Sequence, residues 1–353
     1  MAEPLLKRHK ASNSSSEVSE DEEVQDVLPR ASLCPQRLRG IGMKLVNRIN
    51  DDYLAMLRDV HRNDFYWTAM EKLPVRGQRV LDLGAGTGLL SLMAAKLGAS
   101  SVLAVEESAD MAAVVKTSAE HNRLQHIIDV HAGHSALLSL AEKDKADVIV
   151  SETFGVLLLQ EGCLKSFIHA RENLAKPGAS ILPAGGAQHA RLLASTALRS
   201  ACSALDPEML HVNTFRDAGQ VRFSLPGGFS VNSLPDACWM SDNISVLEVD
   251  FASSRPSDIP SSRHFRVQIL EDGIVDAVVT SWEVWADKDR TLLLSTAADS
   301  TKGQPWGFAR DAHWGQGFQV RSCRGGAAAR SARLDWNQAS RGTGRCCSSP
   351  CRG

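Results

Sequence analysis

The stretch that decides the fold is Val80-Leu81-Asp82-Leu83-Gly84-Ala85-Gly86-Thr87-Gly88-Leu89-Leu90. An apolar run typical of a buried strand gives way to glycines at every second position, and an apolar helical pattern follows. Glycine permits positive φ and close approach to a ligand, and the first N–H groups of the next helix lack partners inside it. The spacing is G-x-G-x-G, whereas the dinucleotide fingerprint is G-x-G-x-x-G. The stretch predicts a strand, a ligand-binding turn and a helix.

A second predicted strand, residues 101–106, ends in a carboxylate about 20 residues after the glycines. A carboxylate at Glu106 can accept hydrogen bonds from both hydroxyls of a ribose. Glu107 follows directly and leaves the register open by one residue, and a solvated strand end is the alternative interpretation of Glu106. Ser108 is a predicted cap of the next helix.

Strand-like and helix-like segments alternate between residues 78 and 183. The predicted strands are 79–83, 102–106, 127–131, 147–151 and 179–182, and the predicted helices are 88–97, 109–120 and 162–174. Such alternation predicts a parallel sheet that is buried on both faces. Ligands bind such sheets at the carboxyl ends of the strands, so we expect Gly84, Glu106, Ser135 and Glu152 at one edge.

The composition describes a globular chain without a strong electrostatic bias, with 43% hydrophobic residues and a net charge of −2 over 353 residues. No basic excess points to nucleic acid as a direct partner. No apolar run reaches the roughly 18 residues of a membrane span, and no signal peptide is evident. We therefore expect a cytoplasmic or nuclear protein with no membrane partner. The segment Lys7-Arg8-His9-Lys10 is either a nuclear signal or simply solvated.

Two carboxylates frame an apolar loop after the fourth predicted strand, in Ser151-Glu152-Thr153-Phe154-Gly155-Val156-Leu157-Leu158-Leu159-Gln160-Glu161-Gly162. Two acids that face one cavity repel each other, which raises the pKa of one of them unless a cation lies between them. A guanidinium is such a cation, because its planar fork of N–H donors matches carboxylates edge to edge.

Glu152 and Glu161 resemble the double-E loop of the protein arginine N-methyltransferases, at that family's spacing. The glycine stretch likewise resembles motif I of the class I S-adenosylmethionine-dependent methyltransferases. The segment 56–63 resembles the family's N-terminal helix, whose arginine matches Arg62. The segment 311–316 resembles the family's Thr-His-Trp loop, with His313 and Trp314 in place and alanine instead of threonine. His169-Ala170 resembles the branch of members seven and nine.

The resemblance implies a role for each matched residue. S-adenosylmethionine is the implied cofactor, and the implied cofactor-binding residues are Arg62, Asp82, Gly84, Gly86, Glu106 and Ser135. Glu152 and Glu161 are implied to hold and polarise the arginine guanidinium. His313 is implied to stabilise the loop or to relay a proton, and Trp314 is implied to line the slot that holds the arginine. No metal is implied.

The resemblance also implies an α/β fold in which a Rossmann-like parallel sheet domain is followed by a mostly antiparallel β-barrel. We expect residues 1–38 to be a disordered acidic and Ser-rich N-terminus and 39–183 to be the cofactor-binding domain with a helical lead-in. Residues 184–322 are the predicted barrel, and 323–353 a non-globular tail without either periodicity. We interpret the tail as an altered C-terminus or a faulty gene model, and an incomplete barrel is the consequence.

Several departures from the family bear on the product. The aromatic Y-F-x-x-Y helix of asymmetric dimethylating members has no clear counterpart, and Tyr53 is the nearest candidate. Ala136 stands where those members carry a glutamate, and Cys163 where many carry a methionine. The departures favour a monomethyl or symmetric dimethyl product over an asymmetric one.

The implied substrates are arginine-containing proteins, with Arg/Gly-rich segments as candidates. A homodimer is one arrangement that the resemblance allows, through an arm between about residues 198 and 229. Two alternatives stay open: a cofactor-binding scaffold without activity, and a class I methyltransferase with another acceptor.

Overall fold

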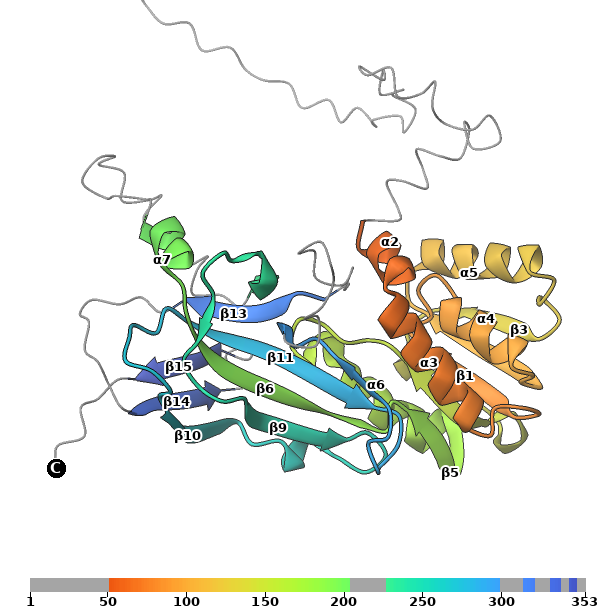
Figure 1. Ribbon diagram of the computed structural model, residues 1–353. Coiled ribbons are helices and arrows are strands. Elements are labelled where there is room, and N and C mark those ends of the chain that lie inside the picture. Colours follow the sequence, from red (N-terminus) through yellow and green to blue (C-terminus); the bar gives the residue numbers. More distant parts are fainter. Residues whose placement is uncertain (1–50, 204–226, 299–313, 321–330, 338–342, 348–353) are drawn as a thin grey trace, which may run out of the picture. The chain divides into compact units, whose positions relative to one another are not determined.

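The computed structural model describes residues 51–203, 227–298, 314–320, 331–337 and 343–347 (Figure 1). The predicted disordered N-terminus, the basic segment 7–10, most of the arm predicted between about residues 198 and 229, and His313 lie outside the described residues. No helix within these ranges is long and apolar enough to cross a membrane.

A five-stranded parallel sheet forms the first part of the described fold. Its order is β3-β2-β1-β4-β5, and every neighbouring pair is parallel, which confirms the predicted α/β architecture. The strands are β1 (Arg79–Leu83), β2 (Ser101–Glu106), β3 (Ile128–Ala132), β4 (Ala146–Ser151) and β5 (Ala175–Leu182). The helices that connect them are α4 (Leu89–Lys96), α5 (Ala109–His121) and α6 (Cys163–His169), which continues as a π-helical turn over Ala170–Leu174.

The predicted helical lead-in consists of α2 (Asp51–Arg58) and α3 (Val60–Lys72). Asp59 begins α3 by accepting a hydrogen bond from the backbone N–H of Arg62, at 3.0 Å. Such a cap satisfies one of the N–H groups that a helix start leaves without a partner. The cap places Arg62 in the first turn of α3. Ser108 caps α5 in the same way, as predicted, by accepting from the N–H of Met111.

A mostly antiparallel, curled sheet follows the parallel sheet. Its path is β7-β13-β11-β6-β8, with β12 paired to β11 and β9 paired to β6. Figure 1 shows β6, β9 and β11 side by side, as their pairing requires. The strands of this sheet are β6 (Gly185–Ala194), β7 (Gly227–Phe229), β8 (Cys238–Trp239), β9 (Ile244–Asp250), β11 (Ala277–Trp285), β12 (Leu293–Ser295) and β13 (Gln316–Val320). β10 (Ser262–Gln268) belongs to a separate three-stranded sheet. The helix α7 (Thr196–Ser203) follows β6.

Two further strands differ from the prediction of a non-globular tail. β14 (Ser331–Asn337) pairs antiparallel with β10 along its whole length, and β15 (Thr343–Cys347) pairs with β14. Leu334 is fully buried at the centre of β14. The segment 331–337 alternates polar residues with Ala332, Leu334 and Trp336, a strand period that the arginine-rich and cysteine-rich composition obscured.

The largest group of buried apolar side chains runs through both sheets. It contains Leu81 and Ile149 of the parallel sheet together with Phe251 and Trp282 of the antiparallel part. Phe154, from the loop after β4, belongs to the same group and stacks on Phe251 at a centroid distance of 5.7 Å. The loop that carries the two acids therefore lies between the two sheets.

Candidate functional site

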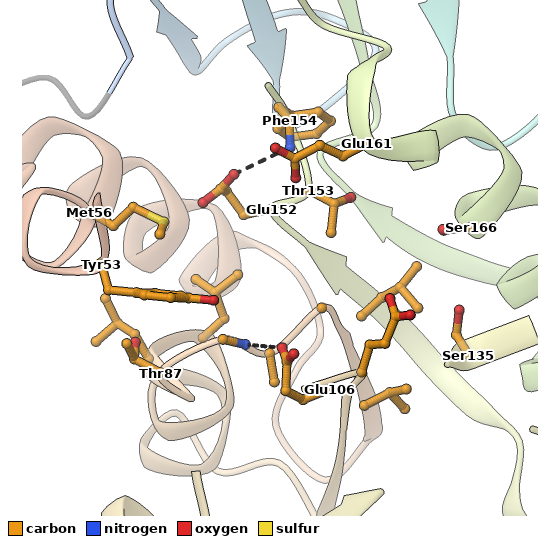
Figure 2. Close-up of a pocket in the computed structure, with 18 of the residues that line it drawn as sticks. Tyr53, Met56, Thr87, Glu106, Ser135, Glu152, Thr153, Phe154, Glu161 and Ser166 are labelled. Atoms are coloured by element: carbon orange, nitrogen blue, oxygen red, sulfur yellow. Dashed lines mark hydrogen bonds between the residues drawn. The ribbon is translucent and has the colours of Figure 1, made fainter. Parts of the chain in front are cut away.

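A cavity of about 460 Å³ opens at the carboxyl ends of β1, β2 and β4, the edge that the sequence predicts (Figure 2). Its walls come from α2, α3, the glycine turn, the end of β2, the turn after β3 and the loop after β4. The lining residues are Tyr53, Met56, Leu57, Arg62, Leu83, Gly84, Ala85, Gly86, Thr87, Leu89, Leu90, Val105, Glu106, Glu107, Gly133, His134, Ser135, Glu152, Thr153, Phe154, Glu161 and Ser166.

The glycine turn has the conformation that its sequence predicts. Gly84, Gly86 and Gly88 have φ values of +77°, +54° and +81°. A Cβ on Gly84 would lie 2.5 Å from Cγ2 of Thr153, and one on Gly88 would lie 2.9 Å from Cγ1 of Val115. Only glycine fits both the dihedral angles and the space at these positions, so the turn forms a floor of bare backbone under the cavity.

Glu106 is held rigidly at the end of β2. One carboxylate oxygen accepts from the N–H of Gly86 and the other from the N–H of Ser108, both at 2.8 Å. β2 ends at Glu106, which settles the register, although Glu107 also lines the cavity. A carboxylate oxygen has more than one lone pair, so Glu106 can still accept hydrogen bonds from a ligand with neighbouring hydroxyls.

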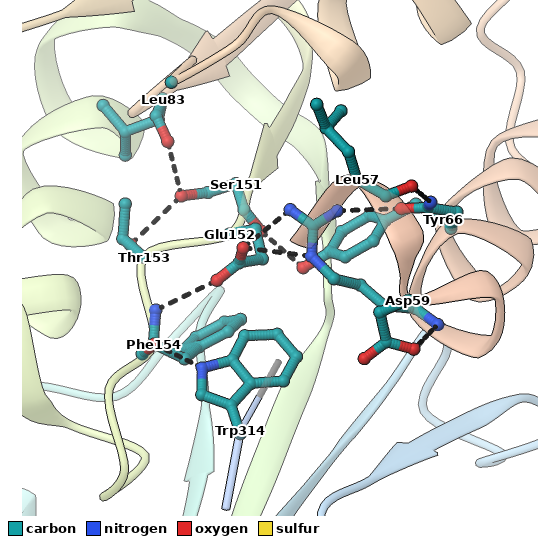
Figure 3. Close-up of polar contacts among 12 residues, drawn as sticks. Leu57, Asp59, Tyr66, Leu83, Ser151, Glu152, Thr153, Phe154 and Trp314 are labelled. Carbon is teal, nitrogen blue, oxygen red and sulfur yellow. Dashed lines mark hydrogen bonds and ion pairs between the residues drawn. The ribbon is translucent and has the colours of Figure 1, made fainter. Parts of the chain in front are cut away.

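Arg62 and Glu152 form a buried ion pair at the opposite end of the cavity (Figure 3). Nε and Nη2 of Arg62 donate to Oε2 of Glu152 at 3.1 Å and 2.7 Å. Burial on its own would lower the pKa of Arg62, but the Glu152 carboxylate holds it above its usual value. Burial raises the pKa of Glu152 despite the Arg62 cation, and the neighbouring charge of Glu161 adds to the rise. A second cation beside Glu152 would favour its ionised form.

Glu161 lines the same end of the cavity as Glu152, so the structure brings the two predicted acids together (Figure 2). Glu161 has a φ of +59° and is followed by Gly162 at +71°. A non-glycine residue is uncommon in this left-handed region. The kink separates the short turn Gln160–Gly162 from α6 and directs Glu161 to the cavity.

Hydrogen bonds at the ends of the strands fix the backbone next to Glu152 (Figure 3). The hydroxyl of Ser151 donates to the carbonyl of Leu83 at 2.7 Å, and the hydroxyl of Tyr66 donates to the carbonyl of Ser151 at 2.8 Å. β1, β4 and α3 are thereby tied together one residue before Glu152. Arg62 reaches Glu152 from α3, the same helix that carries Tyr66.

Asp82 is a predicted cofactor-binding residue that the structure places behind the cavity wall. Asp82 is fully buried and is not among the residues that line the cavity. Its Oδ2 accepts from the hydroxyl of Ser91 at 2.6 Å, whereas its Oδ1 is buried without a hydrogen-bond partner. Successive side chains of a strand point to opposite faces, and Asp82 points toward α4, which carries Ser91. Burial raises the pKa of Asp82 to about 6.

Trp314 lies behind the acidic loop and not along the cavity wall. Its side chain is buried, its Nε1 donates to the carbonyl of Phe154 at 2.9 Å, and the residue is absent from the cavity lining. Trp314 supports the loop backbone in the structure, and its role beside the arginine slot stays a prediction. Its predicted neighbour His313 lies outside the described residues. Ser135 is buried and lines the cavity, as predicted.

Tyr53, named from the sequence as the nearest candidate for the aromatic helix, lines the cavity, whereas the lining residues Met56 and Ser166 were missed as site residues. The ring of Tyr53 lies 3.4 Å from where a Cβ on Gly86 would be, so α2 covers the glycine turn. Met56 belongs to the same helix, and its helical spacing signalled only a packed face. Ser166 reaches the cavity from α6, and no local pattern marks it. Among the described residues, no group of three or more His, Cys, Asp or Glu could hold a metal ion.

Comparisons with known proteins match this chain to methyltransferases. A family model described as ribosomal protein L11 methyltransferase (PrmA) matches residues 66–185. The arginine N(omega)-methyltransferase of Streptomyces achromogenes subsp. streptozoticus is 30% identical over 276 residues, which cover 75% of this chain and 70% of that enzyme.

The chain belongs to the protein arginine N-methyltransferase family. Protein arginine N-methyltransferase 7 of Xenopus laevis is also 30% identical, over 285 residues that cover 75% of this chain and 41% of that protein. The chain thus spans about two fifths of this relative and a larger share of the Streptomyces enzyme.

Solved structures show the same arginine methyltransferase fold. Arabidopsis thaliana protein arginine methyltransferase 10 superimposes with a TM-score of 0.66 and 23% identity, over 80% of this chain and 86% of that chain. The Trypanosoma brucei PRMT1 enzyme-prozyme heterotetrameric complex with AdoHcy gives a TM-score of 0.64 and 22% identity, over 81% and 86%.

Proposed function

We propose that this chain transfers a methyl group from S-adenosylmethionine to a guanidinium nitrogen of arginine. The observation that carries the proposal is the buried Arg62–Glu152 pair with Glu161 beside it, at one end of a cavity whose other end holds Glu106. Glu152 pairs with the buried Arg62 there, and Glu161 adds a second carboxylate at the same end of the cavity, which leaves negative charge for a second flat cation.

The residues of the cavity fit S-adenosylmethionine. Glu106 is preset by two backbone N–H groups to accept the hydroxyls of a ribose. Ser135 lies where it can meet the adenine edge, and the bare backbone of Gly84 and Gly86 allows close approach. Arg62 lines the cavity as well as pairing with Glu152, so its guanidinium can face the carboxylate of the methionine part. When bound, S-adenosylmethionine supplies a methyl group on a positively charged sulfur.

Glu152 and Glu161 prepare the arginine for attack. A protonated guanidinium has no free lone pair, and carboxylates on two edges localise its charge away from the nitrogen that reacts. The two carboxylates would hold that nitrogen toward the methyl group that bound S-adenosylmethionine would supply. The proton of the methylated nitrogen passes to one of the two carboxylates, directly or through water. Most of the rate gain is positional and electrostatic.

Three finer points are part of the proposal. A monomethyl or symmetric dimethyl product is supported by the lack of a clear Y-F-x-x-Y pattern and by Cys163 in place of methionine. Protein arginines are the proposed acceptors, while free arginine is the competing one, because the Streptomyces relative is named without reference to protein. Homodimerisation and a cytoplasmic or nuclear location remain predictions from the sequence.

The test is a tritium-methyl transfer assay with an Arg-Gly peptide, the same peptide with lysine in place of arginine, and free arginine. Transfer to the arginine peptide that is lost in Glu152→Gln and in Glu161→Gln supports the proposal. Glu172→Gln is the matched control, because Glu172 is exposed and its carboxylate pairs with Arg255. Calorimetry with S-adenosylmethionine distinguishes an enzyme from an inactive scaffold, because the scaffold binds the cofactor but transfers no methyl group. Full transfer by both Glu152→Gln and Glu161→Gln would refute the proposed roles.

A further inference from the structure

The acidic loop, residues 152–161, is held from its barrel side by three side chains. Nε1 of Trp314 donates to the carbonyl of Phe154, and Nε1 of Trp282 donates to the carbonyl of Gly155, both at 2.9 Å. Oε1 of Gln188 accepts from the N–H of Leu158 at 2.8 Å. These bonds hold three backbone groups that lie between Glu152 and Glu161 in the sequence.

The loop has few regular hydrogen bonds of its own in this region. β4 ends at Ser151, and the next turn begins at Gln160. A buried backbone group needs a partner, and outside helices and strands that partner is often a side chain. The path of the loop backbone therefore depends on where the barrel places its donors and acceptors.

Gln188 is an unusual residue for its position. It is buried in β6, next to Ala187 and within two residues of Ala190. A buried amide is costly unless its polar atoms find partners. Gln188 uses both ends: Oε1 binds the loop, and Nε2 donates to the carbonyl of Ser281 in β11 at 2.8 Å. The side chain bridges β11 and the loop.

Trp282 is fully buried and packs directly on the loop. Its ring lies 5.5 Å from that of Phe154 and 4.7 Å from that of Trp314, measured between centroids. The indole N–H then adds a directional bond to this apolar packing, which fixes the rotation of the Gly155 peptide. Gly155 has no space for a side chain, because a Cβ there would lie 2.7 Å from Cβ of Gln160.

We propose that Trp282 and Gln188 are positioning residues that set the distance and orientation of Glu152 relative to Glu161. This inference rests on the proposed function. Neither residue lines the cavity, and each acts through the loop backbone. β6 and β11 of the barrel thereby contribute to the transfer step without touching cofactor or acceptor. A misplacement of about 1 Å at a reacting centre can lower a rate about 100-fold.

The test uses Trp282→Phe and Gln188→Met in the full chain. Each variant carries an apolar side chain of related shape and lacks the bond to the loop, and Gln188→Met also lacks the bond to the carbonyl of Ser281. We expect kcat to fall about 10-fold to 100-fold for each. The dissociation constant for S-adenosylmethionine should change less than about 2-fold, because Gly86 and Glu106 belong to the parallel sheet domain. A merely structural role would not separate kcat from cofactor binding.

Two matched controls come from the same barrel. Ser241→Ala removes another fully buried polar side chain, whose hydroxyl also accepts from one backbone N–H, that of Leu192, and donates to one carbonyl, that of Asp242. Trp285→Phe removes an indole from the same strand as Trp282, where Trp285 stacks with Arg290. Both controls should keep kcat within about 2-fold of the unsubstituted chain.

Amide hydrogen exchange provides a readout that does not need activity. In Gln188→Met the N–H of Leu158 loses its acceptor, so loop peptides should exchange faster while peptides of α5 do not. If the unsubstituted chain transfers no methyl group, the proposed function is wrong. In that case amide hydrogen exchange of the loop alone tests whether Trp282 and Gln188 hold it. If one variant does not fold, the other decides. The inference is overturned if kcat and loop exchange in the folded variants match those of the controls.

Discussion

Asp82 provides a stability test whose sign and size follow from its burial. It lies at 0% exposure with one oxygen bound to Ser91 and the other without a partner. Burial raises its pKa from an ordinary value of 3.8 to about 6. A carboxyl whose pKa is raised on folding makes the protein less stable wherever the folded protein has to ionise it.

The effect on the free energy of unfolding can be worked out from the two pKa values. Well below pH 3.8 the group is protonated in both states and costs nothing, and above about pH 6 the full cost applies. At about 1.4 kcal/mol per pKa unit, the full cost is about 3 kcal/mol. Between pH 4.5 and 7.5 it should grow by about 2 kcal/mol. Asp82→Asn abolishes this cost. The free energy of unfolding of the variant, relative to that of the unsubstituted chain, should therefore rise by about 2 kcal/mol between pH 4.5 and 7.5.

Urea unfolding at a series of pH values measures the difference in unfolding free energy between Asp82→Asn and the unsubstituted chain. Groups that titrate alike in both proteins do not contribute to this difference. The control is Asp147→Asn, whose difference from the unsubstituted chain should stay nearly constant between pH 4.5 and 7.5 and should change with the opposite sign only below about pH 4. Desolvation works against it, but Lys176 and the N–H of Arg79 lower the pKa of Asp147, so that carboxylate stabilises the fold as pH rises. A difference between Asp82→Asn and the unsubstituted chain that stays constant with pH, or that follows the control, would show that the burial argument is wrong.

Three further substitutions test the site. Gly84→Ala should destabilise the chain by about 1–2 kcal/mol in thermal unfolding and weaken cofactor binding, because its φ is +77° and Thr153 occupies the space. Arg62→Met should cost about 3–5 kcal/mol by leaving Glu152 buried and unpaired, and the double variant with Glu152→Gln should recover part of the loss. Glu106→Gln should weaken S-adenosylmethionine binding about 10-fold in calorimetry without changing the melting temperature by more than a few degrees.

The parallel sheet could be predicted because its signals are local. The predicted strand 79–83 coincides with β1, and the predicted helix start at Ser108 coincides with the cap of α5. The glycine spacing signals a turn that only glycine can make, and the structure contains it. The two acids after β4 could be placed at the same cavity because parallel strands end at one edge of a sheet.

Other features depend on contacts that the sequence pattern does not carry. Asp82 follows two apolar residues and precedes the glycine turn, so its position suggested the ligand, yet the alternation of the strand directs it to Ser91. Tyr53 reaches the glycine turn from a helix about 30 residues earlier in the sequence. β14 was missed because the arginine-rich and cysteine-rich composition of the tail masked a short alternation of polar and apolar residues around Leu334. In the structure, Leu334 is buried in a strand that pairs with β10.

The acidic loop explains why an arginine methyltransferase site needs both sheets. The parallel sheet can bring Glu152 to the cavity, because β4 ends one residue before it. It cannot by itself fix Glu161, which follows an irregular segment and sits at a φ of +59°. Strain of about 1–2 kcal/mol at such a residue persists only when its surroundings hold it. Trp282 and Gln188 hold the middle of that segment, so the spacing of the two acids depends on the barrel.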